Sequence, residues 1–202
     1  MKPFAESCEQ NKDVILERIK PLLTSSTSLL EIGSGTGQHA LHFAKAMPHL
    51  QWYTSERQAF LGGIQMWLDE ASSSNKDTGN VHSPIALDVM QNNWPELQVD
   101  AIFTANTLHI MSLTEVQMLF KKAPLLLHEN GILLVYGAFN YHGHYSSESN
   151  RHFDAWLKSR DPDSGIRDFE EIDKLAQKSS LQLQADYEMP ANNRLLFWQK
   201  KS

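Results

Sequence analysis

The residues best suited to do chemistry lie in a glycine-rich turn near the N-terminus. The apolar stretch Ser28–Ile32 predicts a buried strand, and residues 37–47 predict a helix. Between these two elements stand three alternating glycines: Gly33, Gly35 and Gly37. Glycines at such a place let the backbone turn tightly and let a ligand approach without a Cβ in the way. Because a helix start also presents free N–H groups, the turn predicts a site for a carboxylate or a phosphate.

The spacing of these glycines distinguishes between classes of cofactor. A dinucleotide fingerprint, G-x-G-x-x-G, would place its third glycine at position 38, which is Gln38 here. The third glycine is instead Gly37, so the pattern reads G-x-G-x-G. A nicotinamide-dependent oxidoreductase is therefore disfavoured. The alternative to a cofactor site is a strand-to-helix turn that binds nothing.

A carboxylate follows the second predicted strand, residues 51–55. Glu56 comes about 20 residues after the last glycine, where a carboxylate can accept hydrogen bonds from both hydroxyls of a ribose. A surface ion pair with the neighbouring Arg57 is the alternative. The position after the strand favours the ribose role.

The glycine pattern resembles motif I of the class I methyltransferases, which use S-adenosylmethionine. The resemblance implies cofactor contacts from the turn and from the acidic residue before it: Glu31, Gly33, Ser34, Gly35 and Gly37. It also implies that Asp88, with Val89 beside it, faces the adenine, although Asp88 is equally suited to cap the short helix that follows. Asn106, after the fourth predicted strand, matches the motif that lies beside the methyl group.

Two kinds of base methylation are disfavoured. Residues 105–110 lack the Asn/Asp-Pro-Pro-Tyr/Phe signature that marks amino methylation of bases. Methylation of a base carbon needs a cysteine nucleophile, and Cys8, the one cysteine, lies far upstream of this segment.

Candidates for the acceptor site follow the fourth and fifth predicted strands. We expect His109 to act as a general base or to orient the substrate, and Tyr141 is the second catalytic candidate. The alternative for His109 is a partly buried histidine bonded to backbone. The expected substrate contacts are Asn140, His142, Tyr145, Asn150 and Arg151. Arg151 could pair with an acidic substrate, or with Glu148 or Asp154 on its own helix.

A metal site is not expected. His142 and His144 form an H-x-H pair, but the other histidines are scattered and no cysteine stands near them. Zinc-type ligand spacing is therefore absent.

Strands and helices alternate along the chain, which predicts an α/β fold. The expected strands cover residues 28–32, 51–55, 81–87, 99–105, 132–136, 181–188 and 195–199, and the last two form an antiparallel hairpin. The expected helices cover residues 13–23, 37–47, 59–71, 151–160 and 168–178, and a further one opens at the capping box of Ser112. We expect a Rossmann-like class I methyltransferase fold with a seven-stranded, mostly parallel sheet and helices on both faces.

One domain covering residues 1–202 is expected, with two special segments. Residues 1–27 form an N-terminal cap segment and helix. Residues 137–167 are polar and aromatic, with little aliphatic mass, which suits a lid or pocket wall over the substrate; a solvated surface loop is the alternative. The polar stretch 72–80 is expected to be a flexible loop.

Composition narrows the class of partner. The 202 residues carry a formal net charge of −6 and no dense Lys/Arg run, so DNA is not expected as a substrate. One cysteine excludes an intramolecular disulfide. No signal peptide and no membrane span are recognisable, so we expect a cytoplasmic protein. The sequence leaves the oligomeric state, monomer or homodimer, open.

Several blocks taken together identify a narrower family. They are KPFAESCE at the N-terminus, LEIGSGTGQH, ANTLHI, YGAFNY, SESNR, GIRD and MPANN. The chain is identified by them as a member of domain-of-unknown-function family 938, the methyltransferase-like protein 26 family. Its members often have Asp in place of Glu56, and either carboxylate can hold a ribose. The resemblance also implies that the segment up to Asn11 folds over the cofactor, with Glu9 or Asn11 facing it.

The resemblance thus implies an S-adenosylmethionine-dependent methyltransferase that releases S-adenosylhomocysteine. A small-molecule acceptor is expected. The alternatives are a non-catalytic protein that binds either form of the cofactor, and a methyltransferase acting on protein or RNA.

Overall fold

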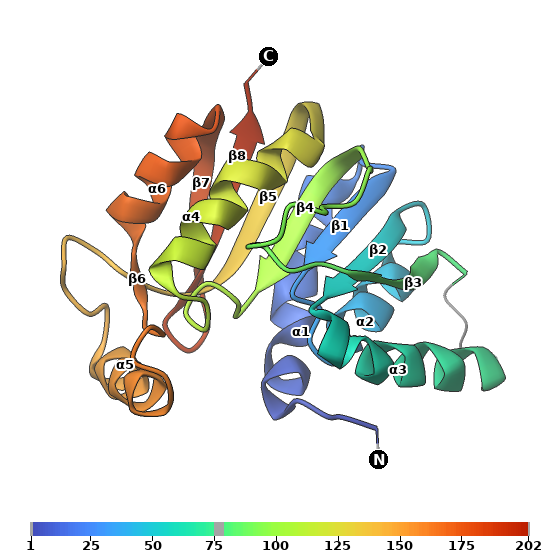
Figure 1. Cartoon of the computed structure of the whole chain (residues 1–202), viewed down its shortest axis with the longest axis horizontal. Coiled ribbons are helices and arrows are strands. Elements are labelled where there is room, and N and C mark those ends of the chain that lie inside the picture. Colours follow the sequence, from blue (N-terminus) through green and yellow to red (C-terminus); the bar gives the residue numbers. More distant parts are fainter. Residues whose placement is uncertain (1, 75–78, 202) are drawn as a thin grey trace. The chain divides into compact units, whose positions relative to one another are not determined.

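The computed structural model describes residues 2–74 and 79–201. The chain forms two compact units, residues 1–103 and residues 104–202, whose elements are labelled in Figure 1. Of the predicted flexible loop, residues 75–78 lie outside the described residues.

The first unit is built on parallel strands. These are β1 (Ser28–Ile32), β2 (Gln51–Glu56), β3 (Val81–Ala86) and the start of β4 (Val99–Ala105). They lie in the order β3-β2-β1-β4, with Leu30 of β1 opposite Tyr53 and Ile102. Because β1 has β2 on one side and β4 on the other, the strand order reverses at β1. Ligands of open α/β sheets bind at the carboxyl ends of the strands beside such a reversal.

Three α-helices belong to the first unit: α1 (Glu6–Ile19), α2 (Gln38–Ala46) and α3 (Leu61–Ser73). Short 3-10 turns, Pro21–Leu23 and Gln58–Phe60, follow α1 and precede α3. Helix α1 begins earlier than the predicted residue 13, because Glu6 and Glu9 supply negative charge to its first turn. The rings of Phe43, Trp52 and Phe103 are fully buried and meet at 5.7–6.2 Å, which fixes α2 against β2 and β4.

The second unit holds the antiparallel part of the fold. Its strands are β5 (Leu127–Asn140), β6 (Arg167–Asp168), β7 (Leu181–Met189) and β8 (Asn193–Lys200). The predicted hairpin is confirmed, since β7 pairs antiparallel with β8, which in turn pairs antiparallel with β5. The two-residue β6 lies parallel to the end of β5 and was not predicted. Among the described residues there are thus eight strands, where seven were expected.

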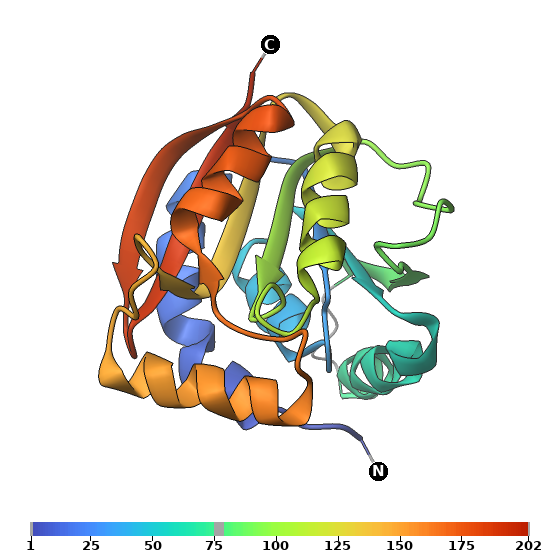
Figure 2. The same cartoon turned by 60° about the vertical axis from the view of Figure 1, so that its left-hand side comes forward.

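The helices of this unit are α4 (Leu113–Lys122), α5 (Glu148–Arg160) and α6 (Phe169–Lys178), and a 3-10 turn (Ala123–Leu126) follows α4. Helices α4 and α6 pack together, whereas α5 lies apart from them (Figure 2). Helix α5 begins at Glu148 because the side chain of Ser147 accepts the N–H of Asn150. The expected α/β fold with a mostly parallel sheet and an antiparallel C-terminal hairpin is confirmed.

Strand β5 is longer than the predicted 132–136 and takes in the first part of the segment expected to be a lid. Gly137, Ala138 and Phe139 are buried strand residues, and Asn140 ends the strand. Residues 137–140 continue the strand because they pair with β8 and β6. This pairing could not be predicted from the sequence, because the residues that follow are polar. Closure of the remaining residues as a lid stays a prediction.

The capping box at the start of α4 gives a test of local stability. Ser112 Oγ accepts the N–H of Glu115 at 3.3 Å, and Glu115 Oε2 accepts the N–H of Ser112 at 2.7 Å. We expect Ser112→Ala to lower the free energy of unfolding by about 1 kcal/mol, because one orphan N–H loses its acceptor. Urea denaturation measures this, with the exposed Thr114→Ala in the same helix as the control. Equal midpoints for the two variants would contradict the role of the cap.

Candidate functional site

The glycine turn has the left-handed backbone that its sequence predicts. Gly33, Gly35 and Gly37 have φ angles of 74°, 56° and 87°. The N–H groups of Gly33 and Ser34 both donate to the carbonyl of Ser55, at 3.1 and 2.9 Å. The turn is therefore fixed to the end of β2, and α2 begins directly after Gly37.

Two of the glycines differ in what surrounds them. A Cβ on Gly37 would stand 3.1 Å from Ile64 Cγ2 of α3, so this glycine permits close packing of helices. A Cβ on Gly35 would meet nothing within 4 Å. Packing within the protein thus explains Gly37, whereas Gly35 borders open space where a ligand could approach.

Glu56 lies beside this open point of the turn. Its Oε2 accepts the N–H of Gly35 at 3.0 Å, and its Oε1 accepts the N–H of Arg57 at 2.8 Å. The carboxylate predicted to hold a ribose is therefore brought to the turn by backbone hydrogen bonds. A carboxylate at the end of β2 is placed where it could accept hydrogen bonds from the two hydroxyls of a ribose, and this role of Glu56 stays a prediction.

Glu31 is buried under the turn, with 2% of its surface exposed. Its Oε2 accepts hydrogen bonds from Ser34 Oγ and Trp52 Nε1, both at 3.0 Å. Burial raises the pKa of Glu31 to about 7, more than these two bonds lower it. Glu31 is thus a proton-binding group at the base of the turn.

Cys8 also lies beside the turn, a placement that its distance in the sequence concealed. Burial, and then the nearby Glu31, raise the pKa of the half-buried thiol to about 11, while a hydrogen bond with Thr36 opposes the rise. The thiol is therefore neutral at physiological pH and is a poor nucleophile.

Gln38 holds the N-terminal segment against the turn, a role that the sequence did not reveal. Its Oε1 accepts the N–H of Ala5 at 2.7 Å and the hydroxyl of Thr36 at 2.9 Å. Its Nε2 donates to Glu9 Oε1 at 3.0 Å. Gln38, which stands where a dinucleotide fingerprint has its third glycine, is therefore buried and hydrogen-bonded through both Oε1 and Nε2.

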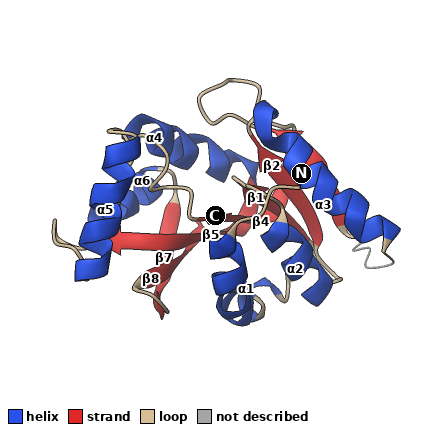
Figure 3. Cartoon of the chain, turned by 90° about the horizontal axis from the view of Figure 1, so that it is seen from below, coloured by secondary structure: helices blue, strands red, loops and turns tan. Residues whose placement is uncertain are grey.

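The rest of the N-terminal segment runs past α3 toward α1 (Figure 3). Pro3 packs on Gly63 of α3, and its carbonyl accepts the indole N–H of Trp67 at 2.8 Å. Asn11 Oδ1 bonds to Nε2 of the buried His39 at 2.7 Å. Glu9 and Asn11 are thus both bonded to α2, and their facing of the cofactor stays a prediction.

The adenine-facing candidates follow β3. Val89 is buried, and Asp88 is half-buried. Oδ1 of Asp88 accepts the N–H of Met90 at 2.9 Å within a turn. The expected short helix after Asp88 is absent from the described residues between β3 and β4, so the helix-capping alternative is wrong. A contact from Asp88 to adenine stays a prediction.

The remaining candidates lie in the second unit, where Asn106 and His109 follow β4. Asn106 has a φ of 57°, and its N–H donates to the carbonyl of Tyr136 at 2.8 Å. His109 is 5% exposed, and its ring meets that of Phe153 edge-on at 5.1 Å. Burial, and then the charge of Arg167, lower the pKa of His109 to about 4, so the imidazole is neutral at pH 7.

Tyr141 is a hydrogen-bond donor in this structure. Its hydroxyl donates to Asp186 Oδ2 at 2.7 Å, and Arg194 Nε donates to the other oxygen of Asp186 at 2.7 Å. Burial and the carboxylate of Asp186 raise the pKa of Tyr141 well above its ordinary value. The phenol stays protonated, so the geometry supplies no support for Tyr141 as a base.

Two of the expected substrate contacts line one groove of about 650 Å³, namely Asn140 and His142. Asn140 Oδ1 is buried and has no hydrogen-bond partner among the described residues. His142 is exposed, and both its N–H and its Nδ1 bond to Glu170 at 3.0 Å. The other residues that line the groove are Leu113, Gly143, Ile166, Arg167, Asp168, Glu170, Glu171 and Lys174.

The other three expected contacts are bonded within the second unit. Tyr145 donates its hydroxyl to Asp154 Oδ2 at 2.7 Å. Asn150 is buried, and its Nδ2 donates to Ser146 Oγ at 2.8 Å and to the carbonyl of Asn192 at 3.1 Å. Arg151 pairs with Glu148 one turn away on α5, the alternative stated for it above. Substrate roles for these three residues stay predictions.

In residues 2–74 and 79–201, no group of three or more His, Cys, Asp or Glu side chains is placed to hold a metal ion. None of the helices in the same part of the chain has the length and apolar character that crossing a bilayer requires.

The contrast between the two glycines predicts different stability effects. We expect Gly35→Ala to cost about 1–2 kcal/mol, the cost of a left-handed backbone in an L residue. Gly37→Ala should cost more, because its Cβ would also press on Ile64. Gly62→Ala on α3, where a Cβ meets nothing within 4 Å, is the control and should be neutral or stabilising. Denaturant midpoints measure the three variants, and equal losses at positions 35 and 37 would refute the packing role of Gly37.

Burial of Glu31 predicts a dependence of stability on pH. Its pKa is raised from 4.5 to about 7 in the folded protein, so the folded state binds the proton more tightly than the unfolded state. This contribution is complete below the unfolded pKa and is lost as pH rises through the folded pKa. Relative to Glu31→Gln, wild-type stability should therefore fall by on the order of 1–3 kcal/mol between pH 4.5 and 7. A difference that is constant across that range in denaturant titrations would contradict the raised pKa.

Solved structures with a similar fold include several methyltransferases. A putative O-methyltransferase from Nostoc punctiforme PCC 73102 matches with a TM-score of 0.80 and 13% identity, covering 96% of this chain and 56% of that chain. Human N-acetylserotonin methyltransferase in complex with S-adenosylmethionine matches with a TM-score of 0.79 and 14% identity, covering 98% and 53%. An O-methyltransferase family protein from Burkholderia thailandensis matches with a TM-score of 0.77 and 12% identity, covering 96% and 59%.

These likenesses establish a shared fold. The chain spans less than two thirds of the length of each of the three structures. The family model described as a protein of unknown function, DUF938, matches residues 2–200. That match covers almost the whole chain and confirms the resemblance drawn from the sequence blocks. The chain belongs to the DUF938 family.

Proposed function

We propose that this chain binds S-adenosylmethionine through its N-terminal unit and transfers the methyl group to a small-molecule acceptor. The observation that carries the proposal is the pairing of Glu56 with Gly35 at the open point of the turn. That pairing lies where the strand order reverses, the place at which α/β sheets bind ligands. The G-x-G-x-G spacing and the shared fold support the same cofactor.

The residues present fit this cofactor. The space beside Gly35, which a Cβ would partly fill, leaves room for a ligand against the backbone of the turn. Glu56 would hold the ribose hydroxyls. The N–H groups of Gly33, Ser34, Gly35 and Gly37 are bonded within the protein, so the N–H of Thr36 is the donor of the turn that would meet the carboxylate of the methionine part. Asp88 and Val89 would face the adenine, and the role of Asn106 beside the methyl group stays a prediction. S-adenosylmethionine supplies a methyl group activated by its bond to a sulfonium sulfur.

The chain's own contribution to transfer is alignment and the exclusion of water. His109 is a neutral imidazole with no hydrogen bond to its ring from any described residue, so a ring nitrogen is free to accept the proton of an acceptor hydroxyl or amine. A pKa near 4 makes it a weak base, which favours orienting the acceptor over complete removal of its proton. Tyr141 keeps its proton and donates a hydrogen bond to Asp186, so it would not act as a base.

An oxygen acceptor on a small molecule is the favoured substrate class. Solved structures with this fold include O-methyltransferase family proteins, and a net charge of −6 disfavours a polyanionic substrate. Asn140 Oδ1, buried without a partner, would accept a hydrogen bond from such a molecule.

Calorimetric titration of the purified protein tests the cofactor. We expect S-adenosylmethionine and S-adenosylhomocysteine to bind and NAD not to bind. Glu56→Ala should weaken binding roughly tenfold to a hundredfold, because hydrogen bonds to a charged group contribute about 1.5–3 kcal/mol. Asp69→Ala, at an exposed acidic residue of α3, is the matched control and should bind normally.

Folded protein, free of copurified ligand, that binds neither S-adenosylmethionine nor S-adenosylhomocysteine would refute the proposal. Binding without turnover across a metabolite screen would instead favour a non-catalytic protein that uses the cofactor as a ligand. Turnover only with protein or RNA would contradict the small-molecule acceptor.

A further inference from the structure

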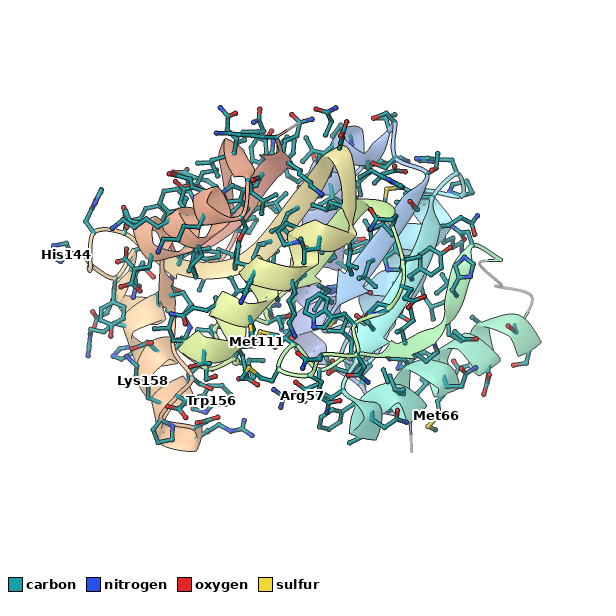
Figure 4. The ribbon with its side chains drawn as sticks, turned by 45° about the horizontal axis from the view of Figure 1, so that its top comes forward. Arg57, Met66, Met111, His144, Trp156 and Lys158 are labelled. Carbon is teal, nitrogen blue, oxygen red and sulfur yellow. The ribbon has the colours of Figure 1, made fainter. Side chains whose placement is uncertain are left out.

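The loop that carries His109 is bonded to a segment more than fifty residues away in the sequence. Four consecutive main-chain carbonyls, those of residues 108–111, accept hydrogen bonds from Ser164–Arg167, here called the return segment because it leads from α5 back to β6. The bonds are Arg167 Nε to Leu108 at 3.1 Å, Gly165 N–H to His109 at 2.9 Å, Ser164 Oγ to Ile110 at 2.9 Å, and Arg167 Nη2 to Met111. Met111, at the end of the loop, is labelled in Figure 4.

The loop has few other means of holding its shape. The N–H groups of Ile110 and Met111 both donate to the carbonyl of Thr107, at 3.0 and 3.1 Å, which closes a single turn. A buried carbonyl without a donor is costly, so a loop outside helix and sheet needs partners from elsewhere. The return segment supplies the hydrogen-bond donors for all four carbonyls of this loop.

Arg167 is half-buried and directs its donors to main-chain oxygens rather than to a carboxylate. Besides Leu108 and Met111, it donates to the carbonyl of Asp163 at 2.8 Å. In the described part of the chain, no carboxylate lies within ion-pair distance of its guanidinium. The charged groups that face it at longer range are Asp154, Asp163, Glu115 and Glu171. A planar guanidinium that spans two carbonyls of one loop sets the distance between them.

The return segment is itself held by α5. Asp154 is 2% exposed, and its Oδ1 accepts the N–H of Ile166 at 2.8 Å. Its other oxygen accepts Lys158 Nζ at 2.6 Å and the hydroxyl of Tyr145 at 2.7 Å. A Cβ on Gly165 would stand 2.9 Å from Asp154 Oδ1, so a larger residue there would displace this carboxylate. The insertion around α5 is thus joined to the loop through a chain of hydrogen bonds.

His109 takes its place from this arrangement. Its carbonyl is bonded to Gly165, its ring meets Phe153 of α5, and its Nδ1 lies where a Cβ on Gly137 would come within 3.6 Å. Helix α5, β5 and the return segment therefore enclose the histidine together.

We propose that Arg167 is a positioning residue that, with the rest of the return segment, fixes the loop carrying His109. Arg167 acts through the loop and would touch no reacting atom. The assignment rests on the proposed function for its part in methyl transfer, whereas the placing of His109 can be measured without any cofactor. Residues 164–167 belong to the segment that composition predicts to be a lid, and their role here is to hold the loop that carries His109.

Nuclear magnetic resonance of the unliganded full chain tests the proposal. In Arg167→Gln, we expect the titration of the His109 ring to move upward by roughly half to one pH unit, because a nearby positive charge is lost. Exchange of the Gly165 amide should rise roughly tenfold, the equivalent of one or two lost hydrogen bonds. Arg167→Lys keeps the charge but cannot span two carbonyls, so it should raise amide exchange with little change in the His109 titration. Arg160→Gln, at the exposed end of α5, is the matched control.

Unchanged His109 titration and unchanged Gly165 exchange in Arg167→Gln would overturn the proposal. If that variant does not fold, Ser164→Ala, which removes one of the four bonds, should still raise Gly165 exchange, and a wild-type value there would also overturn it. Titration with S-adenosylmethionine separates the two proposals. Failure of the wild type to bind refutes the proposed function alone, and normal binding by a folded Arg167→Gln places the defect in the loop.

Discussion

The left-handed backbone of residues 33–37 is the constraint on which the N-terminal unit depends. Three φ angles between 56° and 87° carry the chain from β1 into α2, a path that costs other L residues about 1–2 kcal/mol each. Because the turn donates two N–H groups to Ser55, the end of β2 is fixed beside it, and Glu56 follows directly. The meeting of a carboxylate with the open Gly35 is therefore a consequence of backbone geometry.

The polar groups of the second unit obey a different constraint, the need to satisfy buried donors and acceptors. Asp154 and Asp186 each accept hydrogen bonds from more than one donor, and Arg167 donates to three carbonyls. The two aspartates bind the hydroxyls of Tyr141 and Tyr145, two residues named above as candidates for the acceptor site. Among the described residues of this unit, Asn140 Oδ1 is a buried acceptor without a hydrogen-bond partner, and the ring of His109 is neutral.

Burial acts on the titratable groups of both units in one direction, toward the neutral form. It raises the pKa of Glu31 to about 7 and lowers that of His109 to about 4. Near neutral pH, Glu31 can therefore exchange a proton under the turn, whereas His109 stays uncharged.

The sequence by itself determined the elements whose signals are local: the glycine turn, the strands flanking it, the capping box of Ser112 and the C-terminal hairpin. Their patterns depend on neighbouring residues, because backbone conformation and hydrophobic periodicity are set within a few positions. Only the tertiary structure decided the extension of β5 to Asn140, the existence of β6, and the partners of Gln38, Tyr141 and Arg167. These depend on hydrogen bonds between residues far apart in the chain, and a polar side chain carries no mark of which distant group will satisfy it.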